Sequence, residues 1–264
     1  MGLIYGPKGV GKTTLIASFP NTLVNMTEQG RANLRIHQWP NWVEKRKHDR
    51  SYVLTYDEEM SFLESVAESG NSKFDRLAID TADQLWQIAV DKLLEDHDII
   101  DISGIPHGGG YPICEDHVKR LLNTIWGSGI GLWLVSHTTT KPRQSFVDET
   151  VLEETVPTMD KRIWAWIRQK VDFVFLYDRV GDDRVLVVRG KDRITASVGP
   201  QNCFLDHNGE EVYRILMPND PTKGYETILA GFNNELPDYD REKERVAALK
   251  KQEVAKKLQQ KIKS

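Results

Sequence analysis

The chain has 264 residues, of which 39% are hydrophobic and 28% charged, and its formal net charge is −4. This length can bury one large α/β core, and the slightly acidic balance argues against a wholly basic nucleic-acid-binding protein. The sequence has only two cysteines, which argues against a disulfide framework, and it has no apolar run of 18 residues that could span a membrane. It also shows no signal-peptide pattern, so we expect a reducing, cytoplasmic setting.

A short apolar run at residues 3–5 is followed by the pattern G-x-x-x-x-G-K-[ST], after which residues 14–19 have a helical pattern. Strand, glycine-rich loop and helix in this order form a phosphate-binding loop, because backbone N–H groups and a helix N-terminus attract an anion. Lys12 is then expected to contact the β- and γ-phosphates of a nucleotide, and Thr13 to bind Mg²⁺. The agreement of spacing and flanks disfavours a chance glycine-rich turn. The predicted nucleotide-binding residues are Gly6, Pro7, Lys8, Gly9, Val10, Gly11, Lys12, Thr13 and Thr14.

A second strand is predicted at residues 22–26, and Glu28 follows shortly after its end. A carboxylate in this position can face the water that attacks a phosphate, so Glu28 is the candidate catalytic base. The alternative is an ordinary solvated loop glutamate. Further along, residues 31–50 are interpreted as irregular, residues 52–54 as a third strand and residues 57–68 as an amphipathic helix.

A short buried strand at residues 77–79 ends at Asp80, and a helix is predicted at residues 82–95. An acid at the carboxyl edge of a buried strand lies beside the bound phosphates, so Asp80 is predicted to hold the metal ion together with Thr13. The alternative is that Asp80 caps the N-terminus of the following helix, a role that Thr81 could fill equally well.

An apolar run at residues 130–135 predicts a strand covered on both faces, after a helix at residues 115–126. His137 follows this strand, where a polar side chain can hydrogen-bond the γ-phosphate and report its loss; the alternative is a surface histidine. Residues 138–158 are polar without a clear period, which predicts a long functional or mobile loop.

The His-Gly-Gly-Gly run at residues 107–110 is interpreted as a flexible loop, because no G-x-S-x-G motif accompanies it.

Residues 161–169 are predicted to form a short helix, and residues 172–177 and 184–188 a β-hairpin with a Gly-Asp-Asp turn. Lys191 and Arg193 follow, and their spacing places both on one face of an extended segment. Such a pair could reach the nucleotide of a neighbouring subunit, as an arginine finger does. A solvated basic turn is the alternative.

Residues 194–236 are loop-rich, and residues 240–264 are predicted to form a charged helix with a thin apolar stripe. From Arg241 to Ser264 there are nine Lys/Arg and three Asp/Glu, whereas the rest of the chain has a balance of −10. We therefore expect a core at residues 1–236 and a basic tail at residues 237–264. The tail could bind nucleic acid, dock on a partner protein or remain a solvated end.

Strands that alternate with helices predict an α/β fold with a doubly wound, mostly parallel sheet, a C-terminal β-hairpin and a charged C-terminal helix. The sequence resembles the RecA-like ATPases over residues 2–200. The resemblance rests on five features: the phosphate loop, the acid after the second strand, the Asp80-Thr81 pair, the polar end of the next core strand and Lys191-x-Arg193. Within that family, the sequence is similar to short phage-encoded nucleotide-binding proteins that act as single-strand annealing recombinases.

The resemblance implies a RecA-like core, ATP and Mg²⁺ as cofactors, assembly of copies into rings or filaments, and binding of single-stranded DNA. It gives Glu28 the role of activating water, gives Lys191 and Arg193 that of cations acting on a neighbouring subunit, and places a DNA-contacting loop at residues 138–158. A single-strand DNA-binding protein is a further candidate partner, a membrane is not, and the host cytoplasm is the expected location.

The expected function is therefore a DNA-stimulated ATPase of phage recombination or annealing. Two alternatives stay open at this point. One is a non-catalytic, nucleotide-dependent loader or mediator module, and the other is a small-molecule kinase. The kinase is disfavoured because the sequence has no clear arginine-dense lid.

Overall fold

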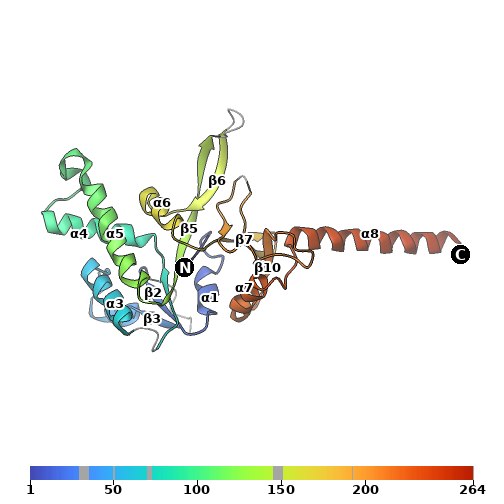
Figure 1. The fold of residues 1–264 in the computed structure, drawn as a ribbon, viewed down its shortest axis with the longest axis horizontal. Coiled ribbons are helices and arrows are strands. Elements are labelled where there is room, and N and C mark those ends of the chain that lie inside the picture. Colours follow the sequence, from blue (N-terminus) through green and yellow to red (C-terminus); the bar gives the residue numbers. More distant parts are fainter. Residues whose placement is uncertain (30–35, 50, 70–72, 145–150, 192, 264) are drawn as a thin grey trace.

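The computed structural model describes residues 1–29, 36–49, 51–69, 73–144, 151–191 and 193–263 (Figure 1). The described strands are β1 (Gly2–Gly6), β2 (Thr22–Met26), β3 (His37–Trp39), β4 (Arg76–Asp80), β5 (Gly131–Gln144), β6 (Val151–Pro157), β7 (Phe173–Val180), β8 (Asp183–Val187), β9 (Ser197–Val198) and β10 (Arg214–Met217). The described α-helices are α1 (Lys12–Ala17), α2 (Trp42–His48), α3 (Tyr56–Ser69), α4 (Gln84–His97), α5 (Gly110–Trp126), α6 (Lys161–Arg168), α7 (Gly224–Phe232) and α8 (Tyr239–Lys263).

The described strands form a ten-stranded mixed sheet with the main order β10-β8-β7-β1-β5-β4-β2-β3. All neighbours from β7 to β3 run parallel, and β8 and β10 extend the β7 edge in antiparallel pairs. Because β1 lies between β5 and β7, the glycine-rich loop that follows it leaves the middle of the sheet. The predicted α/β fold with a mostly parallel sheet, the β7–β8 hairpin and the charged C-terminal helix are confirmed.

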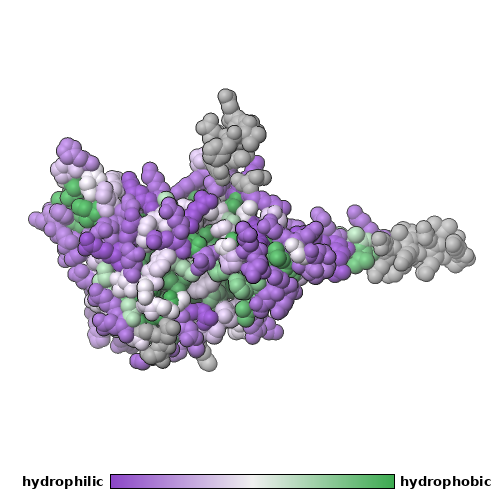
Figure 2. Space-filling view, viewed as in Figure 1, coloured by the Kyte–Doolittle hydropathy of each residue, from purple (hydrophilic) through white to green (hydrophobic). Residues whose placement is uncertain are grey.

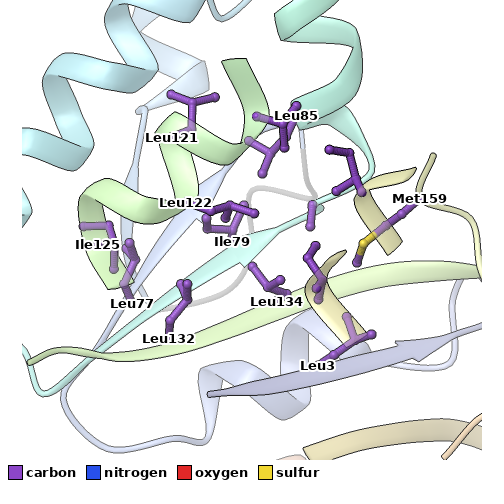
Figure 3. Close-up of a cluster of buried hydrophobic side chains, with 14 of the residues drawn as sticks. Leu3, Leu77, Ile79, Leu85, Leu121, Leu122, Ile125, Leu132, Leu134 and Met159 are labelled. Carbon is purple, nitrogen blue, oxygen red and sulfur yellow. The ribbon is translucent and has the colours of Figure 1, made fainter. Parts of the chain in front are cut away.

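Helices cover both faces of the sheet, because successive strand residues point to opposite sides. Leu3 and Tyr5 face α3, α4, α5 and α6, whereas Ile4 between them faces α1 and α7. Figure 3 shows the first of these two cores, in which leucine and isoleucine side chains of β4 and β5 meet those of α4 and α5. Two apolar layers thus fix the sheet and leave its carboxyl edge free for polar residues.

The predicted strand at residues 52–54 is wrong, and the edge strand is instead β3, which is followed by α2. Aromatic contacts within the tertiary structure set this arrangement. Trp39 stacks on Phe62 of α3 with ring centroids 4.0 Å apart, and Trp42 Nε1 donates a hydrogen bond to the carbonyl oxygen of Met26 at 2.8 Å. The stretch predicted as irregular therefore supplies two anchors for the end of the sheet, although residues 30–35 and 50 lie outside the described part.

The predicted loop at residues 138–158 is also wrong over its described part. Strand β5 continues to residue 144 and pairs with β6 in an antiparallel arm, with Thr138 opposite Pro157. This arm stands away from the body (Figure 1), so neither of its faces is continuously buried. An apolar–polar alternation is the usual signal of a strand, and a projecting hairpin has little reason to show it. Residues 145–150 lie outside the described part.

The C-terminal segment packs against the first helix before α8 begins. Gly224 opens α7 so close to α1 that a Cβ there would lie 2.5 Å from Cδ1 of Leu15. The backbone N–H of Tyr225 donates to Oγ of Ser18 at 2.9 Å. The stretch predicted as loop-rich therefore holds β9, β10 and α7, and it builds one flank of the glycine-rich loop's helix.

Helix α8 projects from the body (Figure 1). Its first turn is anchored, because Tyr239 donates to Oδ2 of Asp183 at 2.7 Å and Arg241 pairs with Asp206 at 2.6 Å. Beyond this anchor Val246 and Leu249 are exposed, and Figure 2 shows hydrophobic side chains among polar ones on the coloured part of the projecting helix. In the described part of the chain, no helix combines the length and apolar character needed to span a membrane.

Candidate functional site

The loop between β1 and α1 has a backbone that needs its glycines. Gly9 and Gly11 have φ values of 83° and 107°, in the left-handed region that other residues rarely adopt. At Gly6, a Cβ would lie 2.0 Å from the carbonyl oxygen of Tyr177 on the neighbouring strand β7. The loop is therefore shaped by the sheet beneath it as well as by its own sequence.

Lys12 begins α1 and is buried over this loop. Its Nζ donates to the carbonyl oxygens of Gly6 at 2.8 Å and Pro7 at 3.1 Å, and lies 3.2 Å from Nδ1 of His137. Burial lowers the pKa of Lys12, and surrounding carboxylates, that of Asp80 first, oppose this effect. The three ammonium donors are thus aimed at three acceptors that a phosphate oxygen could replace.

Thr13 and Asp80 meet beside this lysine. Thr13 Oγ1 donates to Oδ2 of Asp80 at 2.6 Å, and Asp80 is only 4% exposed. Burial raises the pKa of Asp80, while the hydrogen bond from Thr13 and the charge of Lys12 lower it. A hydroxyl and a carboxylate at the carboxyl end of a strand are the oxygen donors with which phosphate-loop proteins hold Mg²⁺.

The oxygen atoms of Thr13 and Asp80 suit a metal ion that is also bound by the phosphates of a nucleotide. Among the described residues, no cluster of three or more His, Cys, Asp or Glu side chains could hold a metal ion without further ligands. Mg²⁺ is usually bound by one or two carboxylates together with substrate phosphates and water. Thr13 and Asp80 are therefore suited to Mg²⁺ that arrives with phosphate groups.

Glu28 and His137 complete the cluster. Oε1 of Glu28 lies 3.5 Å from Nε2 of His137, and Nε2 of Gln84 donates to Oε2 of Glu28 at 3.4 Å. The interaction with His137 lowers the pKa of Glu28, so the carboxylate is charged at neutral pH. Because an ammonium can only donate, Nδ1 of His137 accepts from Lys12 and its Nε2–H faces Glu28.

Asp83 is a site residue that the sequence interpretation missed. Its carboxylate accepts hydrogen bonds from Oγ of Ser136 at 2.6 Å and from the backbone N–H of His137 at 2.8 Å. It therefore fixes the middle of β5, where the pairing with β1 ends and from which the His137 side chain reaches Lys12. In the sequence, Asp83 cannot be told apart from the other acids that favour the start of a helix.

Lys191 and Arg193 do not join this cluster within one chain. Nζ of Lys191 lies 3.9 Å from the ring centroid of Tyr213, and the backbone carbonyl of Arg193 accepts from the N–H of Thr155 at 2.7 Å. The Arg193 side chain is exposed. No contact of either cation with the glycine-rich loop is recorded in the part of the chain that the structure describes. A role toward a neighbouring subunit stays a prediction.

The fold and this cluster together define a P-loop NTPase core. The glycine-rich loop follows a central strand of the parallel sheet, a buried lysine begins the next helix, and a Thr–Asp pair lies beside that lysine. Residues 1–197, about three quarters of the chain, match the family model of an AAA domain. The protein belongs to this AAA domain family, which indicates an ATPase-type, nucleotide-binding domain. The chain matches none of the curated proteins with which it was compared.

Proposed function

We propose that the protein binds ATP together with Mg²⁺ and hydrolyses it to ADP and phosphate. The observation that carries this proposal is the convergence of Lys12, Thr13, Asp80, Glu28 and His137 at one edge of the sheet. These residues come from α1, from the segment just after β2, from the end of β4 and from the middle of β5, so the sheet topology itself brings them together.

Each residue has a role that follows from its position. Backbone N–H groups of the loop and the Lys12 ammonium bind the β- and γ-phosphates, and the ammonium exchanges its carbonyl partners for phosphate oxygens. Thr13 and Asp80 would hold Mg²⁺, which neutralises charge on the phosphates when it is bound. Glu28 orients the attacking water.

In the hydrolytic step, these groups account for every bond and proton that moves. A water oxygen forms a bond to the γ-phosphorus, and the bond from that phosphorus to the β–γ bridging oxygen breaks, so ADP leaves with the electron pair. One water proton passes to the Glu28 carboxylate, whose low pKa keeps it ready as an acceptor. His137 holds Glu28 on one side and contacts Lys12 on the other, so it lies where the γ-phosphate would be sensed.

The metal role of Asp80 can be tested through the Mg²⁺ dependence of ATP binding. We expect wild-type protein to bind ATP more tightly with Mg²⁺ than with EDTA, and Asp80→Asn to lose most of that difference. The conservative change keeps the hydrogen bond from Thr13 while it removes the charge. An equal Mg²⁺ dependence in both proteins would contradict the assignment.

We further propose that copies of the chain assemble and bind single-stranded DNA, as the RecA-like resemblance implies. Three features support this: the projecting β5–β6 arm, the basic α8 and the exposed Arg193. The test is ATP turnover measured against added single-stranded DNA, with particle size recorded alongside. Stimulated turnover in an assembled particle is expected. ATP binding without turnover would favour the loader or mediator module. Transfer of phosphate to a small molecule would favour the kinase.

A further inference from the structure

A cavity of about 200 Å³ adjoins the glycine-rich loop on the flank of α1 away from Asp80. Gly11 and Thr14 line it from the loop and α1, Tyr177 and Arg184 line it from β7 and β8, and Met217 lines it from the end of β10. A space of roughly 10–15 Å³ is enough for one water molecule, so this cavity can take a small organic group. Its walls join two parts of the fold that are far apart in sequence.

Arg184 brings an unpartnered group to this cavity. Its Nε is buried and has no hydrogen-bond partner, and no ion pair of its guanidinium is recorded among the described residues. The residue opposite it in the β7–β8 hairpin is Arg179, another cation. The adjacent carboxylate of Asp183 is taken by Tyr239 and Lys243. A buried donor without a partner costs free energy, which a ligand with suitable acceptors would recover.

The remaining walls suit a flat apolar group. Tyr177 is buried, and its ring lies 3.9 Å from the position of a Cβ on Gly11. Met217 and Pro218 line the same cavity. Burial raises the pKa of Tyr177 and the charge of Arg184 opposes this, which agrees with their closeness. Apolar walls with one or two oriented donors are typical of sites that recognise small organic ligands.

The two sides of the loop therefore differ in chemistry. Thr13 points to Asp80, where the phosphates, the metal ion and the attacking water belong, whereas Thr14, about 100° further round the helix, lines the cavity. We propose that the nucleoside part of the bound nucleotide occupies this cavity, and that Arg184 is a nucleotide-binding residue. This inference rests on the proposed function.

The test compares two ligands that differ only in the nucleoside. Binding of Mg-ATP and of inorganic triphosphate with Mg²⁺ is measured by calorimetry for wild type, Arg184→Ala and Arg184→Gln, with melting curves to show that the variants fold. The control variant is Arg179→Ala, which removes an exposed arginine from the facing strand. The Arg184 variants are expected to bind ATP about tenfold more weakly and triphosphate with unchanged affinity, and the control to match wild type.

The other outcomes are separable. Unchanged ATP affinity in both Arg184 variants would overturn the assignment while leaving the proposed ATPase intact. An equal loss for ATP and triphosphate would show that Arg184 acts on the phosphates and would overturn the nucleoside site. If wild-type protein bound neither ligand, the proposed function itself would fail.

Discussion

At the scale of single residues, Asn25 and Glu59 form a buried polar pair between β2 and α3. Both are fully buried, and Nδ2 of Asn25 donates to Oε1 of Glu59 at 2.5 Å. Oδ1 of Asn25 and Oε2 of Glu59 have no partner. Burial raises the pKa of Glu59 to about 8, so this carboxyl holds a proton at neutral pH, and its unpartnered Oε2 can carry that proton. The pair sits at the end of β2, three residues before Glu28.

This pair predicts a pH dependence of stability. Because the pKa of Glu59 is raised from 4.5 to about 8 in the folded state, the folded protein holds the proton more tightly than the unfolded chain. Its contribution is complete below about pH 4.5 and is lost as pH rises to 8, on the order of a few kcal/mol. Urea unfolding at pH 5, 6.5 and 8 measures this loss. In Glu59→Gln, whose amide keeps both donor and acceptor, the loss should disappear. A wild-type and variant difference that does not change with pH would contradict the protonated pair.

A second prediction at this scale concerns Glu28. Glu28→Gln should keep ATP affinity, because the side chain contacts His137 and Gln84 rather than the loop, and should lower turnover by about 10²–10⁴-fold. Affinity and steady-state phosphate release are measured on the same preparation. The control is Glu64→Gln, which changes an exposed glutamate on α3. Normal turnover in Glu28→Gln would remove Glu28 from the mechanism.

At the scale of elements, the two projections of the molecule are the β5–β6 arm and α8. The arm begins where β5 continues beyond His137, and the backbone of Thr155 at its base is hydrogen-bonded to the segment that holds Arg193. Among the described residues, the hydrogen bonds and ion pairs that join helix α8 to the body come from residues 239–243, those of Tyr239 and Arg241 included. Both elements are therefore placed by the core but extend beyond it.

The basic end of α8 can be removed without its anchor. A chain that ends at Leu249 loses six Lys and one Glu but keeps Tyr239 and Arg241 in place. If α8 binds DNA phosphates, this truncation should weaken binding of single-stranded oligonucleotide at low salt and flatten the dependence of affinity on salt concentration. Fluorescence anisotropy over a salt series measures both. An unchanged salt slope would assign the DNA contact to the core.

At the scale of the whole molecule, a self-assembled form would bring Arg193 of one copy to the nucleotide of the next. Arg193→Ala should then bind ATP but lose turnover, and Lys12→Ala should lose turnover because its affinity for ATP is strongly reduced. When the two inactive proteins are mixed in equal amounts, about a quarter of the sites combine an intact Lys12 with an intact Arg193 from a neighbour. Turnover near that fraction is expected, and turnover that stays at the level of the separate variants would exclude action between subunits.

The features that could be predicted from the sequence are those set by the spacing of residues close together in the chain. The glycine-rich loop, Lys12 and Asp80 were recognisable because spacing and flanking strands carry the signal. The edge strand β3 was missed because a stack between Trp39 and Phe62 holds it, and neither residue alone marks a strand. Asp83 was missed for a related reason, since its contacts with Ser136 and His137 depend on β4 and β5 being neighbours, and the position of Arg184 at the cavity likewise depends on which strands adjoin β7. Tertiary contacts of this kind have no counterpart in local periodicity.

The central claim is that the loop at residues 6–13 binds a nucleoside triphosphate through Lys12. The most direct measurement is a calorimetric titration of Mg-ATP into wild type, Lys12→Ala and the control Lys250→Ala, which changes an exposed lysine of α8. One saturable site is predicted in wild type and control, with affinity lower by about a hundredfold in Lys12→Ala. Equal affinity in all three proteins would contradict it.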